Sequence, residues 1–196
     1  MRKQKEISYP TSMQWKKELA RMNYRERYRH MFWSTVSVLA LVCALAVLIS
    51  TLWLPVLQIY GSSMTPSLNE NDIVISVKSK KYEYGDIVAF YYNNKVLIKR
   101  VIATAGEWVE LSEDGDLYLN GVLQEEAYVK DKALGECDIE MPYQVPEGRL
   151  FVMGDHRSVS VDSRSETVGC VSEEQIVGKL IYRIWPFENS GFVGNR

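Results

Sequence analysis

Residues 85–102 read GDIVAFYYNNKVLIKRVI and give the clearest indication of the fold. Two runs rich in β-branched and aromatic residues, 87–92 and 96–102, are separated by Asn93-Asn94. Such residues favour strands, and asparagine tolerates the left-handed backbone that a tight turn needs. The stretch therefore predicts two antiparallel strands joined by a short turn.

Short apolar runs separated by turn residues continue on both sides of this hairpin. They are 72–77, 108–111, 117–119 and 122–123, which flank the strong turn signal Asn120-Gly121, then 150–153 and 179–185. No long amphipathic helix is evident after residue 55, only a turn at 172–177. We therefore expect a mostly β domain, built on an antiparallel sheet whose strands follow one another at short spacing.

The N-terminal part has a different character. Residues 32–54 contain no charged side chain, and a membrane-spanning helix needs about 20 apolar residues. Trp33 and Trp53 stand near the two ends, where aromatic rings prefer the membrane interface. The run is too long, and its basic lead-in too extended, for a removable signal peptide. The pattern indicates one permanent transmembrane anchor.

Charge sets the expected orientation of that anchor. Residues 1–31 carry nine Lys/Arg and three Glu, a charge of +6, so the rest of the chain carries −8 of the total −2. Positive flanks stay in the cytoplasm. We expect a basic cytoplasmic tail at 1–31, helical or flexible, an anchor at 32–55 and an extracytoplasmic domain at 56–196. The asymmetry indicates membrane topology and no nucleic-acid partner.

Cysteine and histidine are sparse. A disulfide between Cys137 and Cys170 is an open alternative, whereas Cys43 lies inside the apolar run. The sequence has no C-x-x-C motif and only two histidines, His30 and His156. We therefore expect neither a metal nor a cofactor.

Residues 60–68, YGSSMTPSL, follow the apolar run directly. Gly61 tolerates unusual backbone angles, and Pro66 cannot continue a helix. The pattern predicts an exposed turn that carries hydroxyls, and a serine there becomes a nucleophile only if a base reaches it. The alternative is a serine-rich linker.

Lys99 is the candidate base. Side chains alternate across a strand, so Leu97, Lys99 and Val101 share one face, and Arg100 lies on the other. Burial disfavours the charged form of lysine and can make it neutral, whereas arginine keeps its proton. A neutral amine beside Ser63 would act as a general base. The alternative is two surface cations on an edge strand.

Residues 154–164, GDHRSVSVDSR, form a third polar cluster after a predicted strand. Asp–Arg pairs can fix such a loop, and hydroxyls can orient an amine. His156 raises the alternative of a Ser-His-Asp triad, but a triad would give Lys99 no role.

At these places the sequence resembles the bacterial type I signal peptidases, of the Gram-positive kind. Four boxes occur in order behind one anchor: 61–68, 85–88, 99–102 and 154–164. The resemblance covers roughly 57–185. It implies a Ser63 nucleophile and a Lys99 general base, with Ser160 holding the lysine. It also implies a salt-bridged loop around that lysine, formed by Asp155, Asp162 and Arg164.

The resemblance further implies a signal-peptidase-like or repressor-protease-like β fold and a serine endopeptidase of the cell membrane. Its partners would be preprotein signal peptides, membrane lipid and the secretion translocon. Substrate would bind as an added strand, with small residues, typically Ala, at the first and third positions before the cut. The matching substrate-binding residues are Leu57, Ile59, Tyr60, Met64, Leu68, Leu97 and Ile98.

Two departures from the common pattern of this family, and one feature that resembles its Gram-positive kind, bear on the chemistry. Gly61 stands where some relatives have a serine donor, which leaves backbone N–H groups for the oxyanion. His156 replaces the usual Asn, and 103–107 read ATAGE where Gly-Leu-Pro-Gly-Asp is common. We expect an altered turn there with intact chemistry.

Other functions stay open at this point. One is a relative that cleaves a narrow set of clients such as pilin-like subunits. Another is a non-catalytic anchored β domain, against which the intact Ser63 and Lys99 argue. A third is a self-cleaving repressor-like protease, which would need a DNA-binding head that a 31-residue tail is too short to supply.

Overall fold

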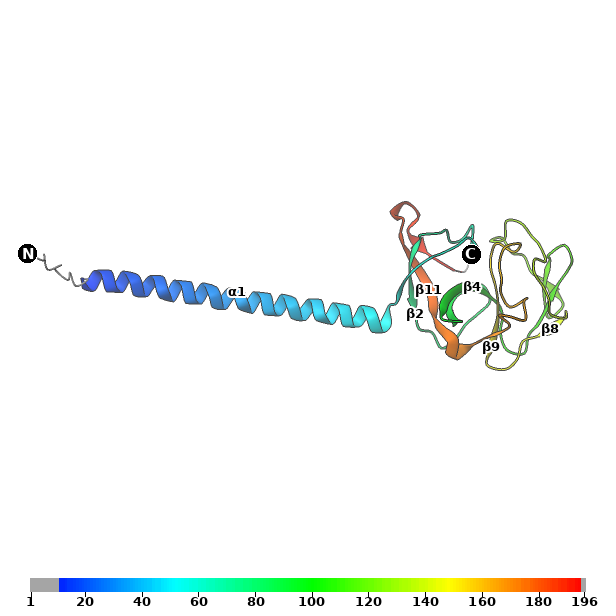
Figure 1. Ribbon diagram of the computed structural model, residues 1–196, viewed down its shortest axis with the longest axis horizontal. Helices are drawn as coiled ribbons and strands as arrows, with labels where there is room; N and C mark the ends of the chain where they lie inside the picture. The colour runs from blue at the N-terminus through cyan, green and yellow to red at the C-terminus, as the bar shows by residue number, and fades with distance from the viewer. Residues whose placement is uncertain (1–10, 195–196) are drawn as a thin grey trace, which may run out of the picture. The chain divides into compact units, whose positions relative to one another are not determined.

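The computed structural model describes residues 11–194, so the first ten residues of the predicted tail and the last two of the chain lie outside it. The chain forms two compact units, Met1–Ile49 and Ser50–Arg196. Helix α1, Ser12–Trp53, is continuous (Figure 1) and passes residues 31 and 32 without a break. Residues 12–31 are therefore helical rather than flexible. By length and composition, α1 is a candidate membrane span.

The second unit is built from antiparallel strands, which confirms the predicted fold class. The strands are β1 Val56–Gln58, β2 Ile73–Val77, β3 Ile87–Tyr92, β4 Lys95–Ala103, β5 Trp108–Leu111, β6 Leu117–Leu119, β7 Val122–Leu123, β8 Tyr143–Gln144, β9 Arg149–Met153, β10 Val171–Ser172, β11 Ile176–Trp185 and β12 Gly191–Phe192. Two 3₁₀ helices, Glu173–Gln175 and Phe187–Asn189, flank β11.

These strands form two sheets. The larger has the order β1-β2-β11-β3-β4-β9-β10, with β12 paired to β11, and the smaller has the order β7-β6-β5-β8. Figure 1 shows β2 beside β11 in the larger sheet, with β8 marking the smaller one. The small sheet packs through Val109, Leu111 and Leu117 against the C-terminal end of β4 and against β9.

Both predicted hairpins are confirmed. β3 and β4 pair from Tyr92 and Lys95 onward, and the two asparagines between them have φ of 43° and 63°. In the second hairpin Asn120 and Gly121 have φ of 51° and 81°. Two consecutive residues with positive φ are the requirement of a turn whose twist matches the strands. Local turn chemistry therefore fixes the register of both hairpins.

The predicted turn after β4 is also present. The Thr104 backbone N–H donates to the Glu107 carboxylate over 2.7 Å, and Gly106 has φ of 84°. This turn carries the chain from the large sheet into the small one.

Strand β4 is paired unevenly, and this shapes the site. Residues 95–100 of β4 pair with β3 along one edge, whereas β9 joins the other edge of β4 only from Arg100 onward. Among the described strands, β1 lies at one edge of its sheet and pairs with β2 alone. The edges of β1 and of residues 95–99 are therefore available to an added strand.

Candidate active site

The turn that carries Ser63 is fixed from below by two apolar side chains. Met64 and Leu68 are fully buried in a core cluster with Val74 and Leu180. Gly61 has φ of 83°, in the left-handed region that glycine adopts without strain. Ser62 is exposed, while Ser63 is half-buried at the pocket described below. The predicted turn is present, and it holds Ser63 in a defined place.

Lys99 lies in β4 with only 3% of its surface exposed. Its Nζ donates to Ser160 Oγ over 2.9 Å, and that hydroxyl donates to Asp162 Oδ2 over 2.6 Å. Burial lowers the pKa of Lys99 from its usual 10.5 to about 8; Asp162 opposes this shift and Arg164 assists it. A useful fraction of the amine is therefore neutral near pH 7, with a lone pair left to accept a proton.

The carboxylate beneath Ser160 is itself held by an ion pair. Arg164 donates from Nε to Asp162 Oδ1 and from Nη2 to Oδ2, each over 2.8 Å. Burial alone would raise the pKa of Asp162, but the Arg164 contacts outweigh it and keep that pKa low. Asp162 thus remains an acceptor and orients the Ser160 hydroxyl, whose oxygen faces Lys99.

Asp155, a member of the predicted salt-bridged loop, is paired with an arginine outside that loop. It forms a two-pronged ion pair with Arg100, at 2.8 and 2.6 Å, and the guanidinium stacks 3.9 Å from the Tyr128 ring centroid. Arg100 also donates to the Gly85 carbonyl over 2.8 Å. Arg100, next to Lys99, therefore ties three motif segments together, since residues 85, 99–100 and 155 meet at its guanidinium.

A third buried ion pair was not predicted from the sequence. Arg157 and Glu126 are paired through both terminal guanidinium nitrogens, Nη1 and Nη2, with the Nη1 to Oε2 bond at 2.9 Å, and both side chains are fully buried. The two residues are 31 positions apart, so no local pattern pointed to them. This pair fastens the loop of residues 154–164 to the irregular segment before β8.

Gly154 lets the turn that carries Ser63 and the loop of residues 154–164 come into direct contact. A Cβ at residue 154 would lie 2.3 Å from Ser160 Oγ and 2.5 Å from the Ser63 carbonyl oxygen. That carbonyl accepts the His156 backbone N–H over 3.1 Å. Because only glycine leaves this space, the Ser63 backbone can approach the hydroxyl that holds Lys99.

His156 faces Thr65. Its Nδ1 lies 3.1 Å from Thr65 Oγ1, and that hydroxyl donates to the Ser62 carbonyl over 2.8 Å. With the threonine proton so engaged, Nδ1 is the donor of the pair. The histidine therefore stabilises the turn that carries Ser63 through its contact with Thr65, a role that an asparagine side chain can also fill. This arrangement does not favour the triad.

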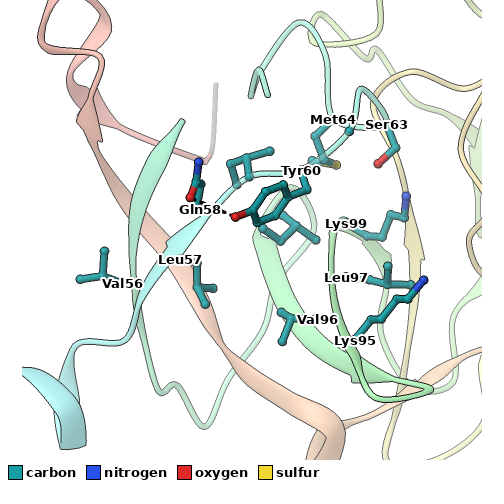
Figure 2. A pocket seen from close by; sticks show the side chains of 13 residues that line it. Val56, Leu57, Gln58, Tyr60, Ser63, Met64, Lys95, Val96, Leu97 and Lys99 are labelled. Carbon is teal, nitrogen blue, oxygen red and sulfur yellow. Dashed lines mark hydrogen bonds between the residues drawn. The ribbon is translucent and has the colours of Figure 1, made fainter. Parts of the chain in front are cut away.

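Ser63 and Lys99 both line a pocket of about 660 Å³ (Figure 2). Six of the seven predicted substrate-binding residues line it. Leu68 does not line it, and its side chain is fully buried in the core cluster that also contains Met64. Sequence reasoning missed four further lining residues: Val56, Gln58, Lys95 and Val96. Val56 and Gln58 lie on β1, which is too short to show a pattern of its own, whereas Lys95 and Val96 begin β4, where the predicted hairpin strand was the signal that could have found them.

The three cysteines, all within the described part of the chain, are free thiols. Cys170 is buried and Cys137 half-buried, so the open alternative of a disulfide is not realised.

Fold and site together define a serine hydrolase with a buried lysine, in a chain with one candidate membrane helix. Residues 32–185 match the family model described as signal peptidase, peptidase S26, and the chain belongs to this family of serine endopeptidases, which cleave signal peptides. The match begins in the apolar part of α1 and ends with β11.

Two relatives, signal peptidase IB of Staphylococcus aureus and thylakoidal processing peptidase 1 of Arabidopsis thaliana, agree with this assignment. The chain is 37% identical over 149 residues to signal peptidase IB of Staphylococcus aureus, covering 66% of this chain and 76% of that protein. It is 37% identical over 146 residues to thylakoidal processing peptidase 1 of Arabidopsis thaliana, and it spans 41% of that longer protein. A signal peptidase I structure from Enterococcus faecalis superposes with a TM-score of 0.44 at 34% identity, over 52% of this chain and 97% of that one.

Proposed function

We propose that this protein removes N-terminal signal peptides from exported preproteins, with Ser63 as the nucleophile and Lys99 as the general base. The observation that carries the proposal is the buried amine of Lys99, held by Ser160, in one pocket with the Ser63 hydroxyl. An amine with a lowered pKa is suited to accept a proton, and a serine next to it is suited to attack a carbonyl.

The reaction follows as acyl transfer in two halves. Neutral Lys99 takes the Ser63 proton while Oγ attacks the scissile carbonyl carbon, and backbone N–H groups, that of Ser63 among them, stabilise the oxyanion. Lys99 then gives its proton to the leaving amine of the mature chain. The signal peptide remains as a Ser63 ester. Lys99 takes a proton from a water molecule as that water attacks the ester carbon. When the bond from Ser63 Oγ to the acyl carbon breaks, Lys99 returns the proton to Oγ, and the signal peptide leaves with a free carboxyl group, so both residues are restored.

The signal peptide would bind as a strand between β1 and the open edge of β4. Main-chain hydrogen bonds supply affinity in this mode, and alternate side chains enter pockets. The half-buried Leu57, Leu97 and Ile98, with buried Ile59, narrow the space next to Ser63. Small side chains at the first and third positions before the cut fit such a surface.

The direct test is cleavage by the full chain in detergent or lipid. A preprotein with an Ala-x-Ala site should be cut once, directly after the second Ala, as read by product masses. Products cut elsewhere, or no products over a range of pH, would contradict the proposal.

Orientation is proposed from charge and hydropathy. The basic tail is expected in the cytoplasm and the β unit outside, where exported preproteins, membrane lipid and the secretion translocon meet. Protease added to wall-stripped intact cells should digest the β unit and spare the tail, as followed with epitope tags at both ends. A protected β unit in cells whose tail is digested would reverse the topology.

A further inference from the structure

Residues 95–99 of β4 form one wall of the pocket, and their side chains alternate between the two faces of the strand. Residues 95–100 pair with β3 one-to-one with no shift of register, so side chains alternate without interruption. Lys95, Leu97 and Lys99 therefore share a face, and all three line the pocket. Figure 2 shows them in order, with Lys99 nearest Ser63 and Lys95 farthest from it.

Exposure changes steadily along this wall. Lys95 and Val96 are exposed, Leu97 and Ile98 are half-buried, and Lys99 is buried. The pocket is thus closed at the reacting end and open at Lys95, and a bound signal peptide leads away from the cut toward the open end. Paired strands have the same rise of about 3.3 Å per residue, so a substrate strand alongside β4 advances one residue for each residue of β4.

This spacing places substrate side chains against the wall. The first residue before the cut lies beside Lys99, where the reacting carbonyl must be. The third then lies beside Leu97, and the fifth lies beside Lys95, because every second side chain of a strand points to the same face. Lys95 therefore contacts the side chain of the fifth substrate residue, just as Leu97 contacts that of the third.

Charge makes this position selective. Among the thirteen residues that line the pocket, none is Asp or Glu. Among the described residues, the ion pairs of 4 Å or less do not involve Lys95. Across the pocket, the Gln58 amide accepts from Tyr60 and donates to Asn71. An unpaired cation at the open end of an apolar pocket attracts a carboxylate and repels a second cation.

From this geometry we infer that Lys95 is a specificity-determining residue, which favours an acidic side chain five residues before the cut and disfavours Lys or Arg there. The inference rests on the proposed function and adds to it a charge preference in the signal peptide. Because Lys95 is exposed, the preference is modest and weakens as salt screens the charges.

The experiment uses preprotein substrates that differ only at the fifth residue before the cut, which is Glu, Gln or Lys. For the wild-type chain in lipid at about 0.05 M salt, kcat/KM is expected to be about fivefold higher for Glu than for Lys, with Gln between them. Lys95→Glu should invert the ratio. Raising the salt to about 0.5 M should bring both ratios toward one.

Two controls separate this effect from a general change of charge. Lys80→Glu alters the net charge equally at an exposed lysine outside the pocket, and it should keep the wild-type preference. A second substrate series varies the fourth residue, whose side chain points to the other face and should give ratios within about twofold in every enzyme.

The outcomes are distinct. Equal cleavage of the Glu and Lys substrates by the wild type, an unchanged ratio in Lys95→Glu, or the same preference at the fourth position would each overturn the role of Lys95 and leave the proposed function standing. A chain that cleaves none of the substrates would overturn both.

Discussion

Lys99→Arg is expected to cleave preproteins no faster than Ser63→Ala, with kcat/KM lowered at least about a thousandfold from the wild type. The reason is that guanidinium keeps its proton in proteins and cannot take one from a serine hydroxyl. The arginine retains the positive charge, so the variant separates charge from basicity. The measurement is kcat/KM on an Ala-x-Ala preprotein, with folding of each variant checked by circular dichroism.

The same base predicts a pH profile for the wild type. Since burial lowers the pKa of Lys99 to about 8, only about a tenth of the amine is neutral at pH 7. For a base that must be deprotonated, kcat/KM should rise about tenfold per pH unit below that pKa and level off above it. Substantial activity in Lys99→Arg, or a profile flat from pH 6 to about 9, would move the general base elsewhere.

Two neighbours serve as matched controls for these variants. Ser62→Ala removes the exposed hydroxyl next to Ser63 and should keep most activity. His156→Asn should also keep most activity, because the asparagine side chain can still meet Thr65, which is the partner of His156 Nδ1. Loss of three orders of magnitude in His156→Asn, with the fold intact, would favour a hidden triad over the lysine.

The parts of the fold that the sequence predicted are those determined by local chemistry. Asn93-Asn94 and Asn120-Gly121 fix two hairpins through positive φ alone, and the uncharged run predicts the helix through composition. Lys99 could be singled out because a lysine between apolar residues of a strand is unusual, and its burial followed from the sheet.

What the sequence did not predict depends on contacts between distant segments. The three residues of β1 have too little pattern of their own, and they become a pocket wall only by pairing with β2. Glu126 and Arg157 meet across 31 positions in an irregular segment. Leu68 belongs to the same motif as Met64 and is buried in the same core cluster, but of the two only Met64 also lines the pocket, which depends on the fold and not on the motif.

Gly154 is the position where such long-range contact is most demanding. Its φ is not among the positive values, so the backbone conformation itself admits any residue. Only space requires glycine, since a Cβ would lie 2.3 Å from Ser160 Oγ and 2.5 Å from the Ser63 carbonyl oxygen. The Ser63 carbonyl belongs to the backbone and cannot rotate away from an added Cβ. A side chain at residue 154 would therefore push the turn that carries Ser63 away from the loop of residues 154–164.

Gly154→Ala is therefore expected to lower kcat/KM by about a hundredfold or more, because displacing reacting groups by about 1 Å has effects of that size. The loop keeps its Asp162–Arg164 and Arg157–Glu126 ion pairs, so the thermal transition should remain cooperative. Gly191→Ala is the matched control: its φ is ordinary, nothing lies within 4 Å of its Cβ position, and it should behave as the wild type. Near-normal cleavage by Gly154→Ala would mean that the Ser63 turn need not touch Ser160, and that Lys99 can act on Ser63 without this close contact.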